Sequence, residues 1–113
     1  MSRYVPDAGD IVWLSLDPRA GREQSGRRPF LVLTPRAYNA RTSLAVGCPI
    51  TSQLTGYPFE VGLASQTTVR GAILADHVKS LDWRERAAEF AARADAADVR
   101  NAKRLIAALL DLG

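Results

Sequence analysis

Five short apolar runs, each with glycine or proline at or near its ends, limit most strongly how this chain can fold. The runs are rich in Val, Ile, Leu and aromatic residues, which is typical of buried β-strands. Their close spacing favours a compact antiparallel sheet or a small barrel. The strands are expected over residues 11–16, 30–34, 43–50, 57–61 and 72–78.

The last third of the chain has a different pattern. Apolar residues recur there at intervals of three and four, which predicts an amphipathic helix. Asp95 or Asp98 is expected to cap its start, and Gly113 to end it. Residues 83–94 remain ambiguous between helix and a final strand, because their alanines favour a helix that tertiary contacts can override. The periodic positions are Val99, Ala102, Leu105, Ile106, Leu109 and Leu110.

Length and composition indicate one domain spanning residues 1–113. With 47% hydrophobic and 24% charged residues, neither disorder nor a membrane protein is favoured. No apolar run is long enough to cross a membrane, and the N-terminus lacks the apolar stretch of a secretory signal. The single cysteine, Cys48, cannot form an intrachain disulfide. The expected compartment is therefore the cytoplasm.

Positive charge is concentrated around one glycine-containing loop, between Pro18 and Pro29. Residues 19–41 hold six arginines and one acidic residue, Glu23, so their balance is 6 − 1 = +5. Arginine suits bidentate contacts with phosphate, and Gly21 and Gly26 permit unusual backbone angles. The loop therefore suits a phosphodiester substrate, although a solvated basic surface is the plainer alternative. The arginines are Arg19, Arg22, Arg27, Arg28, Arg36 and Arg41.

Two further polar clusters follow strands or lie within them. Thr51, Ser52 and Gln53 come directly after the strand expected at 43–50, at the rim of any sheet. In the run over 72–78 and beyond, strand alternation would place His77 and Lys79 on one face. Each cluster has an ordinary structural explanation as well, either a turn or a solvated lysine.

Several common types of catalytic site find no support in the sequence. One histidine and one cysteine, far apart, are not a recognisable metal-ligand set, so no metal is expected. The chain has no nucleophile-elbow motif and no phosphate-binding or dinucleotide-binding glycine pattern. No cofactor is expected.

Taken together, the clusters resemble the MazF/PemK family of toxin–antitoxin endoribonucleases. Five sequence blocks look like those of the family, in order and at similar spacing, at residues 4–13, 21–29, 49–51, 56–61 and 75–84. The resemblance implies a mainly β fold with a C-terminal helix, a small SH3-like barrel of the PemK/CcdB type. It also implies a homodimer that cleaves single-stranded RNA without a metal, and a MazE-like antitoxin whose acidic flexible tail occupies the same basic groove.

The resemblance also assigns roles to residues. By the Gly-x-Arg-Pro pattern the functional arginine is Arg28, and Thr51 supplies the paired hydroxyl. Glu23 is a rival general base, because a free arginine has a pKa above ~12 and is a poor base. Contacts with substrate are expected from Gln24, Arg27, Ser52, Gln53, His77 and Lys79. His77 stands where many relatives have glutamine, so base contacts there are expected to differ.

The resemblance implies that the 2′-hydroxyl of the RNA attacks the adjacent phosphate, leaving a 2′,3′-cyclic phosphate and a 5′-hydroxyl. The substrate would be mRNA, rRNA or tRNA, and DNA could bind without being cut. Two alternatives stay open. One is a CcdB-like toxin that poisons DNA gyrase, although such toxins end in a tryptophan-bearing tail and this chain ends in Leu112 and Gly113. The other is a non-catalytic module that binds nucleic acid or an antitoxin.

Overall fold

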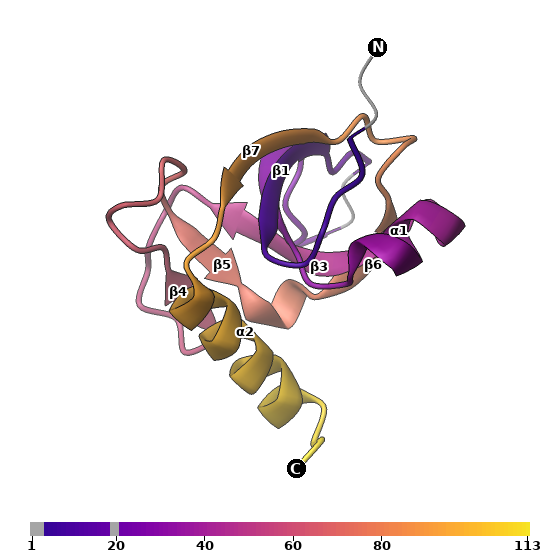
Figure 1. Cartoon of the computed structure of the whole chain (residues 1–113). Coiled ribbons are helices and arrows are strands. Elements are labelled where there is room, and N and C mark those ends of the chain that lie inside the picture. Colours follow the sequence, from indigo (N-terminus) through magenta and orange to yellow (C-terminus); the bar gives the residue numbers. More distant parts are fainter. Residues whose placement is uncertain (1–3, 19–20) are drawn as a thin grey trace.

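The computed structural model describes residues 4–18 and 21–113, which form a strongly curved antiparallel sheet with two α-helices (Figure 1). In Figure 1, β1 and β7 lie at the top, whereas β4, β5 and α2 lie below. The elements are β1 (Asp10–Ser15), β2 (Arg27–Val32), α1 (Arg36–Thr42), β3 (Leu44–Thr51), β4 (Glu60–Gly62), β5 (Ala72–Leu74), the 3₁₀ turn η1 (Ala75–His77), β6 (Lys79–Asp82), β7 (Glu89–Arg93) and α2 (Ala96–Leu109).

The long strand β3 organises the sheet. The strand order is β4-β5-β3-β2-β1-β7, and β6 pairs with the first half of β3. The described strands at the two ends of this order, β4 and β7, do not pair with each other, so the sheet does not close into a barrel. The mainly β fold with a C-terminal helix is confirmed.

The sheet is buried on both faces, which explains why its strands are continuous apolar runs. One core cluster includes Ile11, Leu31 and Ile50, and the apolar face of α2 packs against it through Val99, Leu105 and Ile106. A second cluster includes Val12, Phe30, Leu81 and Trp83. Neighbouring residues such as Ile11 and Val12 therefore enter different cores, as strand alternation requires.

The expected strand over 72–78 is wrong in its second half. The chain leaves β5 after Leu74, makes the turn η1, and re-enters the sheet as β6 beside a different part of β3. The four other expected strands are present, with ends that differ by one to three residues: the run expected at 11–16 is β1 at Asp10–Ser15, that at 30–34 is β2 at Arg27–Val32, that at 43–50 is β3 at Leu44–Thr51, and that at 57–61 is β4 at Glu60–Gly62.

Helix α1 was not predicted, because its sequence has no apolar repeat. Tertiary contacts stabilise it instead. Its N-terminal cap, Pro35, makes no side-chain capping bond. The buried Asn39 side chain donates to the carbonyl oxygens of Pro6 and Thr34, at 2.8 and 2.9 Å. The backbone carbonyl of Asn39 accepts a 2.9 Å bond from the indole N–H of Trp83. These contacts join segments that are far apart in the sequence.

The C-terminal helix was predicted correctly, and Asp95 is its cap. The Asp95 carboxylate accepts a 2.9 Å bond from the backbone N–H of Ala97. The expectation for Gly113 was wrong, since α2 ends at Leu109 and its C-terminal cap is Leu110. The ambiguous region resolves into strand β7, which pairs with β1 from Asp10 to Trp13. No helix in the described part of the chain is long and apolar enough to cross a membrane.

Candidate active site

The loop between β1 and β2 is closed at its base by backbone contacts. The N–H of Leu16 donates to the carbonyl of Gly26 at 2.9 Å, and the N–H of Gly26 donates to the Asp17 carboxylate at 2.9 Å. Gly26 has a φ of +76°, a conformation that side chains disfavour. Arg86 donates from Nη1 to the carbonyls of Ser15 and Asp17, both at 3.0 Å. Arg19, one of the basic residues noted above, lies outside the described residues.

Strand pairing brings Arg28 to Thr51. Strands β2 and β3 are antiparallel, with Phe30 opposite Pro49 and Leu31 opposite Cys48. Continuing this register by two residues sets Arg28 opposite Thr51, at the end of both strands where the β1–β2 loop joins.

A central cavity of about 210 Å³ lies at this point. It gathers six of the nine candidate site residues from three separate segments: Glu23 and Gln24 from the loop, Arg28 from β2, and Thr51, Ser52 and Gln53 from the end of β3. Ser25 completes its lining.

Two hydrogen bonds orient the arginine and the threonine. Arg28 donates from Nε to the carbonyl of Ser25 at 3.0 Å, which leaves its Nη groups to meet a phosphate. Thr51 Oγ1 accepts a 3.2 Å bond from the backbone N–H of Gln53, so its hydroxyl proton is available to a ligand. Both side chains are therefore presented as donors to the same cavity.

Lys79 and His77 lie beside the central cavity, not within it. They line an adjoining cavity of about 290 Å³ with Arg22, Glu23 and Asp76. The Lys79 ammonium lies 4.0 Å from the Glu23 carboxylate, which links β6 to the loop. The alternation argument for His77 and Lys79 was wrong, because His77 belongs to η1 and only Lys79 is in a strand.

Two residues near the central cavity, Tyr57 and Asp76, received no functional role from the sequence analysis. They line a cavity of about 630 Å³ that also includes Gln24, Thr51 and His77. The Tyr57 hydroxyl donates to Asp76 Oδ2 at 2.9 Å, and this bond raises the pKa of Tyr57. The other oxygen, Oδ1, is buried, has no hydrogen-bond partner in the described part of the chain, and lies 4.0 Å from His77 Nε2. Both residues lie in sequence blocks that resemble the family, and that resemblance is the signal by which sequence reasoning could have found them.

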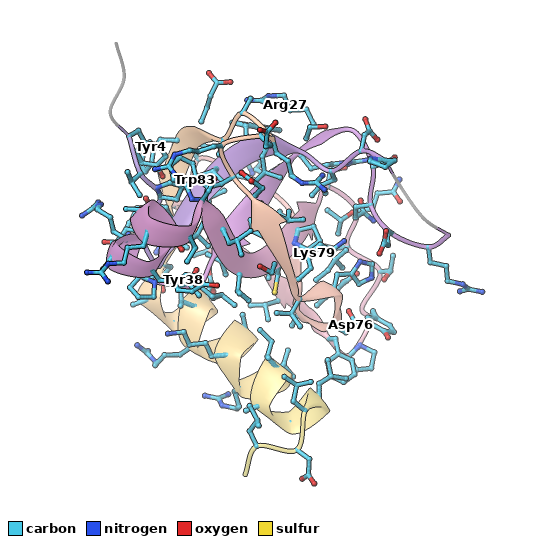
Figure 2. All side chains as sticks on the ribbon, turned by 90° about the vertical axis from the view of Figure 1, so that its right-hand side faces the viewer. Tyr4, Arg27, Tyr38, Asp76, Lys79 and Trp83 are labelled. Carbon is cyan, nitrogen blue, oxygen red and sulfur yellow. The ribbon has the colours of Figure 1, made fainter. Side chains whose placement is uncertain are left out.

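Arg27 points to a different part of the surface. Its Nη2 donates to the carbonyl of Ala87 at 2.9 Å and forms an ion pair with Glu89. Figure 2 shows Arg27 well above Lys79 and Asp76. It does not line the central cavity, whereas Arg28, one residue later, does.

Within residues 4–18 and 21–113, no three His, Cys, Asp or Glu side chains gather as a possible metal site. Cys48 is fully buried, and burial raises the pKa of its thiol to about 12.

A family model matches nearly the whole chain. Residues 7–110 match the model of the PemK-like, MazF-like toxin of type II toxin–antitoxin systems. The chain belongs to this family. The match extends from just before β1 to the end of α2, so it includes every segment that lines the central cavity.

Relatives in the PemK/MazF family are close in sequence and in structure. The endoribonuclease toxin MazF of Escherichia coli K12 is 51% identical over 88 residues, which are 78% of this chain and 78% of the relative. A crystal structure of MazF from Deinococcus radiodurans superposes with a TM-score of 0.93 at 53% identity, covering 96% of this chain and 98% of that one. MazF in a MazE–MazF complex from the same organism gives a TM-score of 0.86 at 46% identity, covering 97% and 100%.

Proposed function

We propose that this chain is the endoribonuclease toxin of a toxin–antitoxin system, and that it cleaves single-stranded RNA sequence-specifically and without a metal ion. The observation that carries the proposal is the central cavity, where a carboxylate, a guanidinium and a hydroxyl converge from Glu23, Arg28 and Thr51. Its curated relatives are named as endoribonucleases, which favours RNA cleavage over gyrase poisoning and over a non-catalytic binding module.

In the proposed reaction the RNA supplies its own nucleophile. The 2′-oxygen forms a bond to the adjacent phosphorus while the bond from phosphorus to the 5′-oxygen breaks, which yields a 2′,3′-cyclic phosphate and a 5′-hydroxyl. Glu23 takes the proton of the 2′-hydroxyl as general base. Arg28 stabilises the charge on the phosphorane and donates a proton to the departing 5′-oxygen. After cleavage, water carries the proton held by Glu23 back to Arg28, so that both side chains regain their starting states. Thr51 donates to a non-bridging oxygen.

Base recognition falls to the side chains around this centre. Sequence-specific contacts with single-stranded RNA use unstacked bases, which polar side chains bind along their edges. Gln24, Ser52 and Gln53 line the central cavity or its rim, and His77 and Lys79 line the adjoining one. These five residues are the candidates for reading the bases on that side of the scissile phosphate.

The same basic surface suits an acidic antitoxin. MazE–MazF complexes of Deinococcus radiodurans are among the structures that this chain matches. A MazE-like antitoxin with an acidic, flexible tail would compete with RNA for the arginines of the β1–β2 loop. We place the active toxin in the cytoplasm as a homodimer.

Cleavage of a mixed-sequence single-stranded RNA in EDTA tests the proposal. We expect the wild type to cut at defined positions and Arg28→Ala to be about 10²- to 10³-fold slower, because a donor to the developing charge is lost. Arg41→Gln is the matched control, since Arg41 is exposed in the last turn of α1 and lines none of the cavities described here. The proposed function would be contradicted if the folded wild type did not cleave the RNA, or if the wild type and Arg28→Ala cleaved it at equal rates.

A further inference from the structure

A second cavity, of about 470 Å³, adjoins the central one and is lined by neither His77 nor Lys79. It shares Arg28 and Ser52 with the central cavity, and Trp13, Arg27 and Arg70 also line it. Neither Trp13 nor Arg70 was assigned a role in substrate binding. Arg28 lines both cavities. When the scissile phosphate of an RNA strand lies at Arg28, a neighbouring nucleotide of that RNA therefore reaches the second cavity.

Trp13 is unusual among the residues of β1. Its neighbours Val12 and Leu14 are buried, whereas Trp13 is 40% exposed. A large aromatic ring in a central strand with that much exposed surface contributes less to the core than its size allows. It offers a flat face on which a base can stack, and stacking of this kind tolerates any base.

Arg70 is held near the end of β3 by its neighbour Gly71. An added Cβ at Gly71 would lie 2.0 Å from the carbonyl oxygen of Thr51, so only glycine permits this approach, and its φ is +128°. The loop is fixed further because the N–H of Leu63 donates to the carbonyl of Gly71 at 2.9 Å. The N–H of Ala64 donates to the buried carboxylate of Asp98 on α2, also at 2.9 Å.

The charge of Arg70 is available to a ligand. Its side chain is exposed, and it forms no ion pair within the described residues. Arg27, by contrast, is paired with Glu89. The second cavity therefore combines an exposed ring, one unpaired guanidinium, and a direct connection to the candidate catalytic arginine.

We propose that this second cavity binds a nucleotide of the RNA that flanks the scissile phosphate, its base stacked on Trp13 and its phosphate on Arg70. This inference rests on the proposed function, because it extends the path of the same substrate. The strand would run from the His77 and Lys79 cavity, past Arg28, to Trp13. A combination of stacking surface and basic groove is how proteins bind single strands without reading sequence, so this end of the path adds affinity more than specificity.

Shortened substrates test this subsite. Once the cut position is mapped, RNAs that lack one more nucleotide at a time are compared from each end. For the wild type, removal of the nucleotide that occupies the cavity is expected to raise KM about tenfold, the effect of losing one stacked base. Trp13→Leu and Arg70→Gln are expected to have a raised KM on the full-length RNA, to lose sensitivity to that truncation, and to keep kcat within about twofold. Trp13→Phe keeps an aromatic face and is expected to retain most of the affinity.

Arg41→Gln is again the control, and circular dichroism and light scattering check the fold and the assembly of each variant. A truncation profile in Trp13→Leu and Arg70→Gln that equals the wild-type profile would overturn the subsite while leaving the proposed function intact. Absence of cleavage by the wild type would overturn both. If these two variants cleave RNA normally but bind an acidic peptide of Glu, Asp and Leu more weakly, the cavity belongs to a protein partner. If they no longer form the dimer, the cavity belongs to the interface with a second copy of the chain. Either result overturns the proposal.

Discussion

Glu23 is the residue whose role most affects the chemistry. It lies on an exposed loop, lines the central cavity with Arg28 and Thr51, and has the Lys79 ammonium 4.0 Å from its carboxylate. A carboxylate side chain can serve as a general base, whereas a protonated guanidinium has no lone pair to accept a proton.

We therefore expect Glu23→Gln, which keeps the shape and removes the base, to lower kcat about 10²- to 10⁴-fold with a smaller change in KM. The measurement is single-turnover cleavage of the mapped RNA. Glu85→Gln is the matched control, because Glu85 is exposed in the turn between β6 and β7 and lines none of the cavities described here. Near-normal cleavage by Glu23→Gln would remove Glu23 from the mechanism.

Cys48 gives a prediction about stability and pH. Burial raises the pKa of its thiol from 9.0 to about 12, so the folded state keeps a proton that the unfolded state loses between these values. The free energy of unfolding should fall with rising pH in this window, by up to about 1.4 kcal/mol per pH unit from this one group. Urea unfolding of the wild type and of Cys48→Ala between pH 8 and about 12 checks this. The wild type should show the steeper decline, and equal slopes would contradict it.

At the scale of elements, the close approach of β5 to the end of β3 fixes the position of Thr51. That approach depends on Gly71, which has a positive φ and no space for a Cβ beside the Thr51 carbonyl. Because the obstacle is backbone, it cannot move aside as a flexible side chain could.

Gly71→Ala is therefore expected to destabilise the fold by about 1–3 kcal/mol and to reduce cleavage by displacing Thr51. Gly62→Ala is the matched control in the neighbouring strand, where an added Cβ would meet only the Leu54 side chain at 3.5 Å. Thermal unfolding and cleavage rates are measured for both variants. Equal effects of the two substitutions would show that crowding at Thr51 is not the cause.

Local sequence signals predicted some elements and failed on others for physical reasons. Strand β1 and the Asp95 cap of α2 were predictable, because an apolar run and a capping carboxylate both act locally. Helix α1 was not, since its stability depends on distant partners of Asn39 such as Pro6 and Trp83. The break between β5 and β6 was missed as well, because a continuous apolar run gives no sign that the chain turns out of the sheet.

The candidate site was found through residue chemistry and family resemblance together. Arg28, Thr51 and Glu23 line one cavity, and their catalytic roles stay a prediction of the resemblance. No sequence pattern connected Trp13 or Arg70 with them, because the connection runs through strand β1 and a loop held by Asp98.

At the scale of the whole molecule, several large apolar side chains stay exposed in the single chain. Leu109, Leu110 and Leu112 are 42%, 54% and 69% exposed at the C-terminal end, and Phe90 is 53% exposed on β7. Exposed apolar surface of this kind is typical of an interface. We expect a homodimer at micromolar concentration, measured by light scattering with the mass followed on dilution. A stable monomer would contradict this assembly.

The most direct test of the central claim replaces the ribose at the cut position by 2′-deoxyribose and compares the products with those from all-ribose RNA, both in EDTA. The account predicts that the all-ribose strand yields 2′,3′-cyclic phosphate and 5′-hydroxyl ends, and that the substituted strand binds but stays intact, because the attacking oxygen is gone. Cleavage of the substituted strand at the same position, or products with 5′-phosphate ends, would show that water attacks the phosphate and would contradict the account.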